Sequence, residues 1–307
     1  MRALIVTAVP AERDAVVRGI RDAGAFEGAR RALPGAPGYD RHRLALPVTG
    51  TADALTLEAL DVDVLAAGVG PAASAAATGS ALATAIADGL PYDLVISAGI
   101  GGGFPAARLR ATGDTATADA AGGAGEGGGA GWAVVVADAI VAADLGAETP
   151  DGFASVTELG FGTVEHRPPA EWVRAAVLAT GGLSGPVLTV STVTGSATRA
   201  AELTTRHPGA LAEAMEGFGV AEAAAGYRVP TLEVRTVSNP VGPRDRAAWQ
   251  IGAALDALAG AFTALARTLP GTGCQPKAAA PEETAGAGGS DTADTADTAD
   301  TADTSNA

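Results

Sequence analysis

The sequence predicts an α/β fold of three layers, in which helices flank a mixed, mostly parallel central sheet. Two observations carry this prediction. Short, nearly continuous apolar runs recur along the chain, as they do in strands that are buried on both faces. Ala-rich segments of helical length separate several of these runs. An alternation of strand and helix is typical of a largely parallel sheet.

The predicted elements can be placed along the chain. Apolar, β-rich runs are predicted to form strands at Ala3–Val9, Val62–Ala67, Leu94–Ala98, Trp132–Ala137, Val187–Val193 and Leu232–Ser238. Ala-rich segments are predicted to form helices at 11–23, 72–88, 170–180, 197–206, 211–226 and 245–267. Ligands of such sheets bind at the carboxyl ends of the strands, so functional residues are expected in the segments that follow them.

Two segments fall outside this pattern. Residues 106–131 include GGAGEGGGAG and are predicted to form a flexible insertion on the surface. Residues 270–307 are polar and end in repeated Asp-Thr-Ala triplets, which predicts a disordered acidic tail, with an acidic interaction tail as the alternative. The globular part is therefore expected to be a single domain over residues 1–269.

Charge and cysteine content narrow the class of protein. The formal charge of −15 disfavours nucleic acid and anionic membranes as partners, because both require a positive surface. The single cysteine, Cys274, excludes an internal disulfide. Neither a signal sequence nor a charge-free run of 18 apolar residues is recognised, so we expect a cytoplasmic protein without a membrane span.

Glu12 and two glycine-rich segments follow predicted strands. Glu12 lies in the first turn of a predicted helix, where a carboxylate either complements the helix dipole or serves as a general base. Gly70 follows the second strand, and Gly99 and Gly101 follow the third, where glycines let backbone amides approach a ligand. Neither segment has the spacing of a phosphate-binding or dinucleotide-binding loop.

Glu216 lies among apolar residues in the predicted helix 211–226. It either points to solvent together with Glu213 or accepts hydrogen bonds from the hydroxyls of a ligand. The three histidines are far apart in the sequence and have no metal-ligand spacing, so no metal site is expected. The serines lack the context of a serine-hydrolase nucleophile.

The order of these features resembles that of the nucleoside phosphorylase and nucleosidase superfamily, on its nucleosidase branch. Within it the chain is most similar to the futalosine hydrolases, through AADLGAETPDGF (142–153), ELGFGT (158–163), TVTGS (192–196), AMEGFGVA (214–221) and SNPVGPRDRAAW (238–249). The resemblance covers residues 1–269 except the insertion. It implies release of hypoxanthine from futalosine in menaquinone biosynthesis, by a homo-oligomer (dimer or tetramer) that uses water and no cofactor.

The resemblance also implies roles for individual residues. Glu12 would activate water, Glu216 would bind the ribose with Met215 against the sugar, and Asn239 would face the leaving base. Gly70, Gly99, Gly101, Ser238 and Phe161 are also predicted to contact the substrate. Phe104 and Phe153 are alternatives to Phe161 for stacking on the base. Arg13, Arg244 and Arg246 are candidates to pair with the benzoate that futalosine carries.

Asn239 departs from the nucleosidases that release adenine, which carry Asp at this position. The purine edge of hypoxanthine presents two acceptors, N7 and O6, which an ionised Asp would repel because it only accepts. An Asn amide can donate to either, so Asn239 predicts a 6-oxopurine. Phosphorolysis of an inosine-like nucleoside, hydrolysis of a methylthioadenosine-like nucleoside and non-catalytic purine binding are the alternatives.

Overall fold

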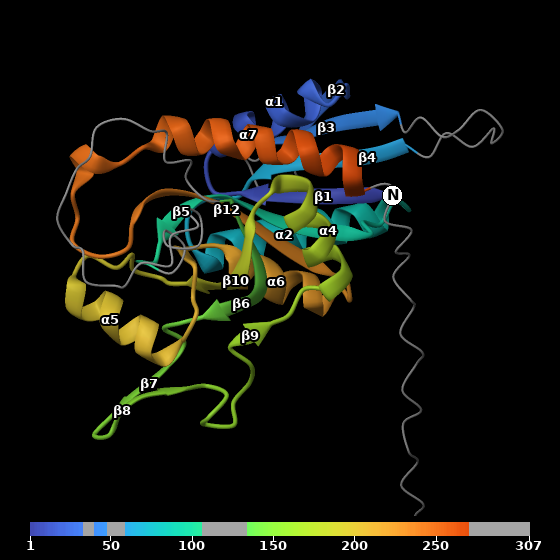
Figure 1. The fold of residues 1–307 in the computed structure, drawn as a ribbon. Coiled ribbons are helices and arrows are strands. Elements are labelled where there is room, and N and C mark those ends of the chain that lie inside the picture. The colour runs from blue at the N-terminus through green and yellow to red at the C-terminus, as the bar shows by residue number, and fades with distance from the viewer. Residues whose placement is uncertain (33–39, 48–58, 106–133, 270–307) are drawn as a thin grey trace, which may run out of the picture. The chain divides into compact units, whose positions relative to one another are not determined.

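The computed structural model describes residues 1–32, 40–47, 59–105 and 134–269, and its architecture is shown in Figure 1. The chain divides into one compact unit, Met1–Cys274, and a second, Gln275–Ala307, that lies outside the described residues. A ten-stranded sheet runs through the first unit, with helices on both faces. The predicted three-layer α/β fold is therefore confirmed. The predicted insertion at 106–131 and the predicted tail at 270–307 both lie outside the described residues.

The strands and helices of the described residues have the following bounds. The strands are β1 (Arg2–Thr7), β2 (Phe26–Ala32), β3 (Asp40–Pro47), β4 (Ala59–Ala66), β5 (Leu94–Gly103), β6 (Val134–Ala142), β7 (Gly146–Thr149), β8 (Gly152–Ser155), β9 (Glu165–His166), β10 (Leu183–Thr189), β11 (Ala212–Ala214) and β12 (Thr231–Pro240). The helices are α1 (Pro10–Asp22), α2 (Pro71–Ala87), α4 (Ala170–Thr180), α5 (Ala197–Arg206), α6 (Gly217–Gly226), the 3₁₀ turn η1 (Arg246–Ala248) and α7 (Ile251–Thr268).

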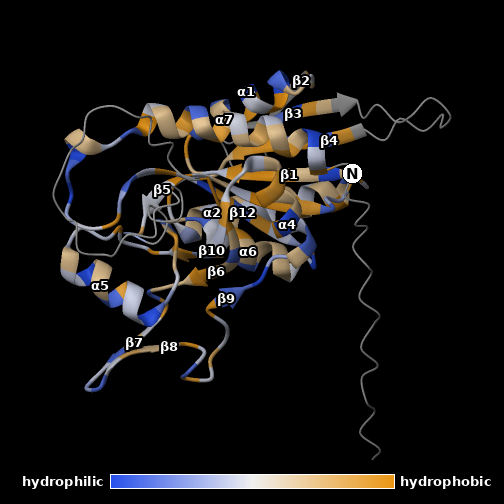
Figure 2. Ribbon diagram, viewed as in Figure 1, coloured by the Kyte–Doolittle hydropathy of each residue, from blue (hydrophilic) through white to orange (hydrophobic). Residues whose placement is uncertain are grey.

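Side chains of alternate residues in the central strands point to opposite faces of the sheet. In β1, Ile5 packs with α1, α4 and α7, whereas its neighbours Leu4 and Val6 pack with α2 and α6. Both sets are buried, which explains why these strands read as continuous apolar runs and colour as hydrophobic in Figure 2. The hydrophobic core therefore has two main layers, one on each side of the sheet.

The sheet is mixed, and one half of it closes on itself. Its order is β11-β10-β6-β12-β5-β1-β4-β3-β2, with parallel pairing of β12, β5, β1 and β4. The end of β5 also pairs with β11, with Ala212 opposite Gly103 and Glu213 opposite Gly102. A Cβ at Gly101 would lie 2.7 Å from the carbonyl oxygen of Glu213, so glycine is needed for this approach. The closure brings the carboxyl ends of β5, β11 and β12 together.

The structure corrects several predicted boundaries. Gly99–Gly103 is the end of strand β5 and not a loop. The predicted helix 211–226 is a short strand, β11, followed by helix α6, so Glu216 caps the helix and does not lie inside it. The short strand β11 is specified by its tertiary pairing with the glycine-rich end of β5. The Ala-rich sequence around it is typical of a helix and gives no local signal of a strand.

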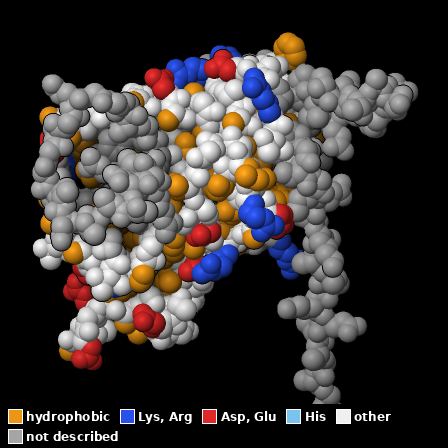
Figure 3. Space-filling model, in the orientation of Figure 1, with side chains coloured by type: hydrophobic (Ala, Val, Ile, Leu, Met, Phe, Trp, Pro, Cys, Tyr) orange, Lys and Arg blue, Asp and Glu red, His pale blue; other side chains and the backbone are white. Residues whose placement is uncertain are grey.

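The stretch Arg246–Thr268 is long and apolar enough to cross a membrane by length and composition alone. In the fold, Leu258, Phe262 and Leu265 of this stretch are buried in the layer formed with α1 and α4. These contacts are those of a core helix. Figure 3 shows one face of the molecule, on which the arginines and acidic residues are interspersed and form no extended basic surface.

Candidate active site

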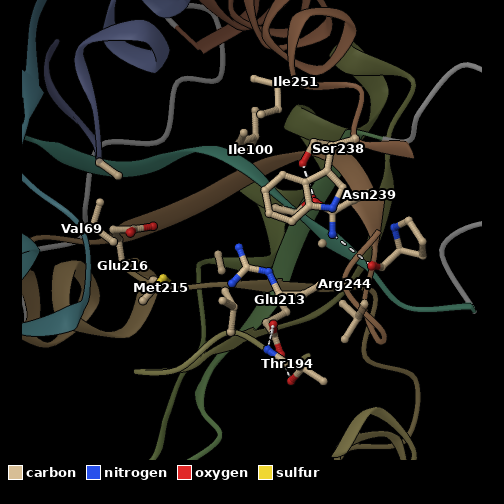
Figure 4. A pocket seen from close by; sticks show the side chains of 18 of the residues that line it. Val69, Ile100, Thr194, Glu213, Met215, Glu216, Ser238, Asn239, Arg244 and Ile251 are labelled. Atoms are coloured by element: carbon tan, nitrogen blue, oxygen red, sulfur yellow. Dashed lines mark hydrogen bonds between the residues drawn. The ribbon is translucent and has the colours of Figure 1, made fainter. Parts of the chain in front are cut away.

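A cavity of about 380 Å³ opens where the carboxyl ends of the strands meet (Figure 4). This volume lies in the range of sites for small molecules. Its walls are formed by the carboxyl ends of β5, β11 and β12 and by the segments that follow β1, β4, β10, β11 and β12. Among the lining residues are Glu12, Ile100, Gly101, Val193, Thr194, Glu213, Met215, Glu216, Ser238, Asn239, Arg244, Trp249 and Ile251.

Glu12 enters this cavity from the first turn of α1, and its side chain is only 4% exposed. One carboxylate oxygen accepts from the amides of Ala8 (3.0 Å) and Val9 (3.3 Å), and the other from the amide of Ile100 in β5 (2.9 Å). Burial raises the pKa of Glu12, although the charge of Arg235 and these amides oppose the rise. The Glu12 carboxylate thus accepts hydrogen bonds from amides at the start of the helix and also faces the cavity.

Glu216 lies at the start of α6 and is 5% exposed. Its Oε1 accepts from the amide of Gly70 at 3.2 Å, and its Oε2 pairs with Nη1 of Arg235 at 3.2 Å. The bonds leave lone pairs on both oxygens, since a carboxylate accepts about four hydrogen bonds. The side chain is therefore fixed in place and still able to accept from a ligand.

Arg235, in the middle of β12, lies fully buried beneath the cavity (0% exposed). It pairs with Glu216 and with Glu233 (2.9 Å) and donates to the hydroxyl of Ser97 (2.8 Å). Burial raises the pKa of Glu233 against the opposing charge of Arg235. The charge of the Arg235 guanidinium is shared among Glu233, Glu216 and Glu12. A Cβ at Gly99 would lie 2.5 Å from Glu12 Oε1 and 2.7 Å from Arg235 Nη1, so this glycine makes room for both.

A β-bulge sets the direction of Ser238 and Asn239. The register of β12 against β5 shifts between Val237 and Asn239, so Ser238 is the extra residue. The Ser238 hydroxyl lies 2.9 Å from Asn239 Oδ1 and 3.3 Å from the carbonyl of Gly101. Asn239 Nδ2 donates to the carbonyl of Pro240 at 3.0 Å. Ser238 therefore occupies the acceptor end of the amide, and one N–H of the NH₂ group remains as a donor in the cavity wall.

Two relatives share the sequence over most of its length. A futalosine hydrolase of Streptomyces coelicolor is 56% identical over 270 residues, which are 88% of this chain and 97% of that protein. The chain belongs to the futalosine hydrolase family. A futalosine hydrolase of Acidothermus cellulolyticus is 41% identical over 270 residues, with 86% of this chain and 90% of that protein covered. No family model matches the sequence.

Solved structures share the fold at low sequence identity. An S-adenosylhomocysteine nucleosidase of Streptococcus pyogenes superposes with a TM-score of 0.60 and 17% identity, covering 88% of this chain and 98% of that one. A futalosine hydrolase mutant of Helicobacter pylori superposes with a TM-score of 0.59 and 15% identity, covering 86% and 98%. These likenesses confirm the predicted nucleoside phosphorylase-like fold for this member of the futalosine hydrolase family.

The structure brings most of the predicted site residues together. Glu12, Met215, Glu216, Gly101, Ser238 and Asn239 all line the cavity. Gly70 and Gly99 lie directly behind it, where Gly70 holds Glu216 and Gly99 accommodates Glu12. Phe161 does not line it and is 81% exposed. Its alternatives do not line it either, since Phe104 is buried in the core and Phe153 stacks on Arg206.

Sequence reasoning missed three residues of this site, Arg235, Glu213 and Trp249. Arg235 lies in a strand that the sequence predicts to be buried. A charged arginine in a buried strand is itself a signal of an ion pair. Glu213 is buried with its carboxylate held by the amide (2.8 Å) and hydroxyl of Thr194, and burial raises its pKa. Trp249 is the aromatic residue of the described lining. Its place at the end of the SNPVGPRDRAAW motif is the sequence signal that could have indicated it.

No cluster of three or more His, Cys, Asp or Glu side chains suited to a metal ion occurs within residues 1–32, 40–47, 59–105 and 134–269. What the described cavity offers instead is a set of fixed carboxylates beside an amide donor. Such a set can hold hydroxyl groups, remove a proton from water and donate to an acceptor on a leaving group.

Proposed function

We propose that this protein hydrolyses the N-glycosidic bond of futalosine, releasing hypoxanthine and dehypoxanthine futalosine in menaquinone biosynthesis. The observation that carries the proposal is that Glu12, Glu216 and Asn239 line one cavity, each held by named hydrogen bonds. Membership of the futalosine hydrolase family supports the choice of substrate.

In the proposed reaction, water adds across the bond between C1′ of the ribose and the purine nitrogen. The bond to the purine loosens first and leaves positive charge on the sugar. Glu216 accepts hydrogen bonds from the ribose hydroxyls and lies near that charge, while Met215 contacts the sugar. Glu12 removes a proton from the attacking water, and a base positioned in this way contributes about 10²–10⁴-fold to the rate.

Asn239 selects the base in this proposal. Ser238 accounts for the oxygen of its amide and Pro240 for one N–H, so the other N–H can donate to N7 or O6 of a 6-oxopurine. The amide stabilises the negative charge that develops on the departing hypoxanthine. A site that matches polar groups in this way rejects a mismatched base by up to about 10⁴-fold.

Water is the proposed nucleophile because the end of β5 places Ile100, Gly101 and Gly102 at the cavity, and these residues bring no hydroxyl to hold phosphate. Incubation with futalosine in phosphate-free buffer tests the proposal. We expect hypoxanthine release that is independent of added phosphate. Release that requires phosphate would instead identify a phosphorylase, and no release from futalosine, inosine or methylthioadenosine would identify a binding protein.

The proposal extends to the setting of the enzyme. We infer a cytoplasmic homo-oligomer, a dimer or a tetramer, from the resemblance to nucleosidases that form oligomers. Light scattering on the purified protein measures the molar mass directly. A mass of one chain, 29.8 kDa, at micromolar concentration would contradict this part of the proposal.

A further inference from the structure

Three arginines near the candidate site differ in what surrounds them. Arg13 pairs with the neighbouring Asp14 at 2.8 Å and does not line the cavity. Arg246 lies 5.8 Å from the centre of the Trp249 ring and is also outside the lining. Arg244 lines the cavity itself, and its side chain extends into the space on the side of Met215 (Figure 4).

Arg244 has no ion pair within the described part of the chain. Its guanidinium lies 5.4 Å from the centre of the Trp249 ring, and its stem passes Gly195, where a Cβ would be 3.7 Å from its Cγ. The residue is exposed, so its charge is now hydrated. The three acidic residues of the lining are engaged elsewhere, Glu12 with backbone amides, Glu216 with Arg235 and Glu213 with Thr194.

The surroundings of Arg244 are apolar. Val193, Trp249 and Ile251 line the cavity with it, and neither they nor the remaining lining residues add a second cation among the described residues. A guanidinium fork matches a carboxylate with two parallel hydrogen bonds. A phosphate has three oxygens to satisfy and is better served by several donors. A flat apolar arm that ends in a carboxylate fits this set best.

We propose that Arg244 is the specificity-determining residue for a carboxylate on the substrate, borne on an apolar arm that lies against Trp249. The inference deepens the proposed function and rests on it, since it assigns a residue to a second group of the nucleoside whose base would face Asn239. The cavity thus recognises two features of one ligand. Asn239 donates to acceptors on the base, and Arg244 pairs with the negative charge of the arm.

The test compares the protein with Arg244→Met and, as a matched control, Arg246→Met. Each is assayed for hypoxanthine release from futalosine, from its methyl ester, and from inosine 5′-monophosphate. We expect Arg244→Met to lower kcat/KM for futalosine by about 10- to 100-fold, the range for a lost charge-assisted hydrogen bond. The loss should fall mainly on KM, should be below about threefold for the ester, and should be absent in Arg246→Met.

Two results would overturn the inference. Equal losses on the acid and the ester would show that Arg244 packs against the arm without reading its charge. A 5′-monophosphate that outcompetes futalosine and depends on Arg244 would assign the residue to phosphate. If the unaltered protein turns over no nucleoside, the proposed function is wrong, and calorimetric Kd values for the same three ligands and variants still decide the inference.

Discussion

The protein buries two ionic clusters at opposite ends of its parallel strands, and they are built in opposite ways. At the amino end, one carboxylate, Asp63, receives Arg2 (2.6 Å), Arg43 (3.2 Å) and the Tyr92 hydroxyl (2.5 Å). At the carboxyl end, one cation, Arg235, lies among Glu12, Glu216 and Glu233. The first cluster has more positive than negative groups, and the second has the reverse.

The pKa values follow this difference. Burial alone would raise the pKa of Asp63, but the hydrogen bonds from Arg43 and Tyr92 and the nearby arginine charges outweigh it and lower the pKa. At the carboxyl end a single arginine does not offset burial, and the pKa values of Glu12 and Glu233 rise. A compensated carboxylate stabilises the fold, whereas one with a raised pKa exchanges its proton closer to neutral pH than a free carboxylate does.

The largest expected effect is the loss of activity in Glu12→Gln. The amide keeps the size of the side chain but cannot take a proton from water, so we expect kcat/KM for hypoxanthine release to fall by about 10²–10⁴-fold. Thermal unfolding of the same variant should change less than that of the Asp63 variant below. Unimpaired hypoxanthine release by Glu12→Gln would remove Glu12 as the base.

Asp63→Asn should have the reverse profile. The change leaves Arg2 and Arg43 without their charged partner in a buried setting, which typically costs about 3–5 kcal/mol. Because Arg43 is partly exposed, we expect about 3 kcal/mol, measured as a loss of unfolding free energy in urea. At urea concentrations below the unfolding transition, kcat/KM should stay within about twofold of the value for the unaltered protein. A variant that keeps its stability but loses activity would erase the contrast between the clusters.

Asn239→Asp adds a carboxylate to the end of the molecule that already has an excess of them. An ionised Asp repels N7 and O6 of a 6-oxopurine, so the ratio of kcat/KM for futalosine to that for its 6-amino analogue should fall, by about tenfold or more. Asn239→Ala is the matched control, because it removes the donor without adding charge. An unchanged ratio in Asn239→Asp would contradict the hydrogen-bond account of base selection.

The smallest expected effect is that activity and stability are lost at different pH values as the pH falls. Glu12 acts in its ionised form and its pKa is raised, so kcat/KM should fall below a pH that lies above the ordinary 4.5, by up to tenfold per unit. Asp63 has a lowered pKa, so its contribution to stability is present above 3.8 and is lost only as the pH falls further. Circular dichroism should therefore remain native where activity declines. Simultaneous loss of both signals would contradict this order.

Much of the candidate site could be predicted because its residues stand next to strand ends. Apolar runs directly precede Glu12, Ser238 and Asn239. A motif indicates Met215 and Glu216, although the sequence predicts a helix around them where the structure has a short strand and a helix start. Phe161 lies in the ELGFGT motif, yet its side chain is exposed, and Trp249 is the aromatic residue at the cavity. Proximity in sequence to a motif does not fix which side chain reaches a cavity, because loop paths depend on long-range packing.

The sequence by itself determined the alternation of strands and helices and the residues at the carboxyl ends of β1 and β12, since both are local patterns of hydrophobicity. Only the tertiary structure decided that β5 closes on β11, that Arg235 lies under Glu12 and Glu216, and that Arg244 reaches the cavity while Arg13 pairs with Asp14. These relations join residues far apart in the chain. Their energies come from burial and charge compensation, which exist only once the sheet has assembled.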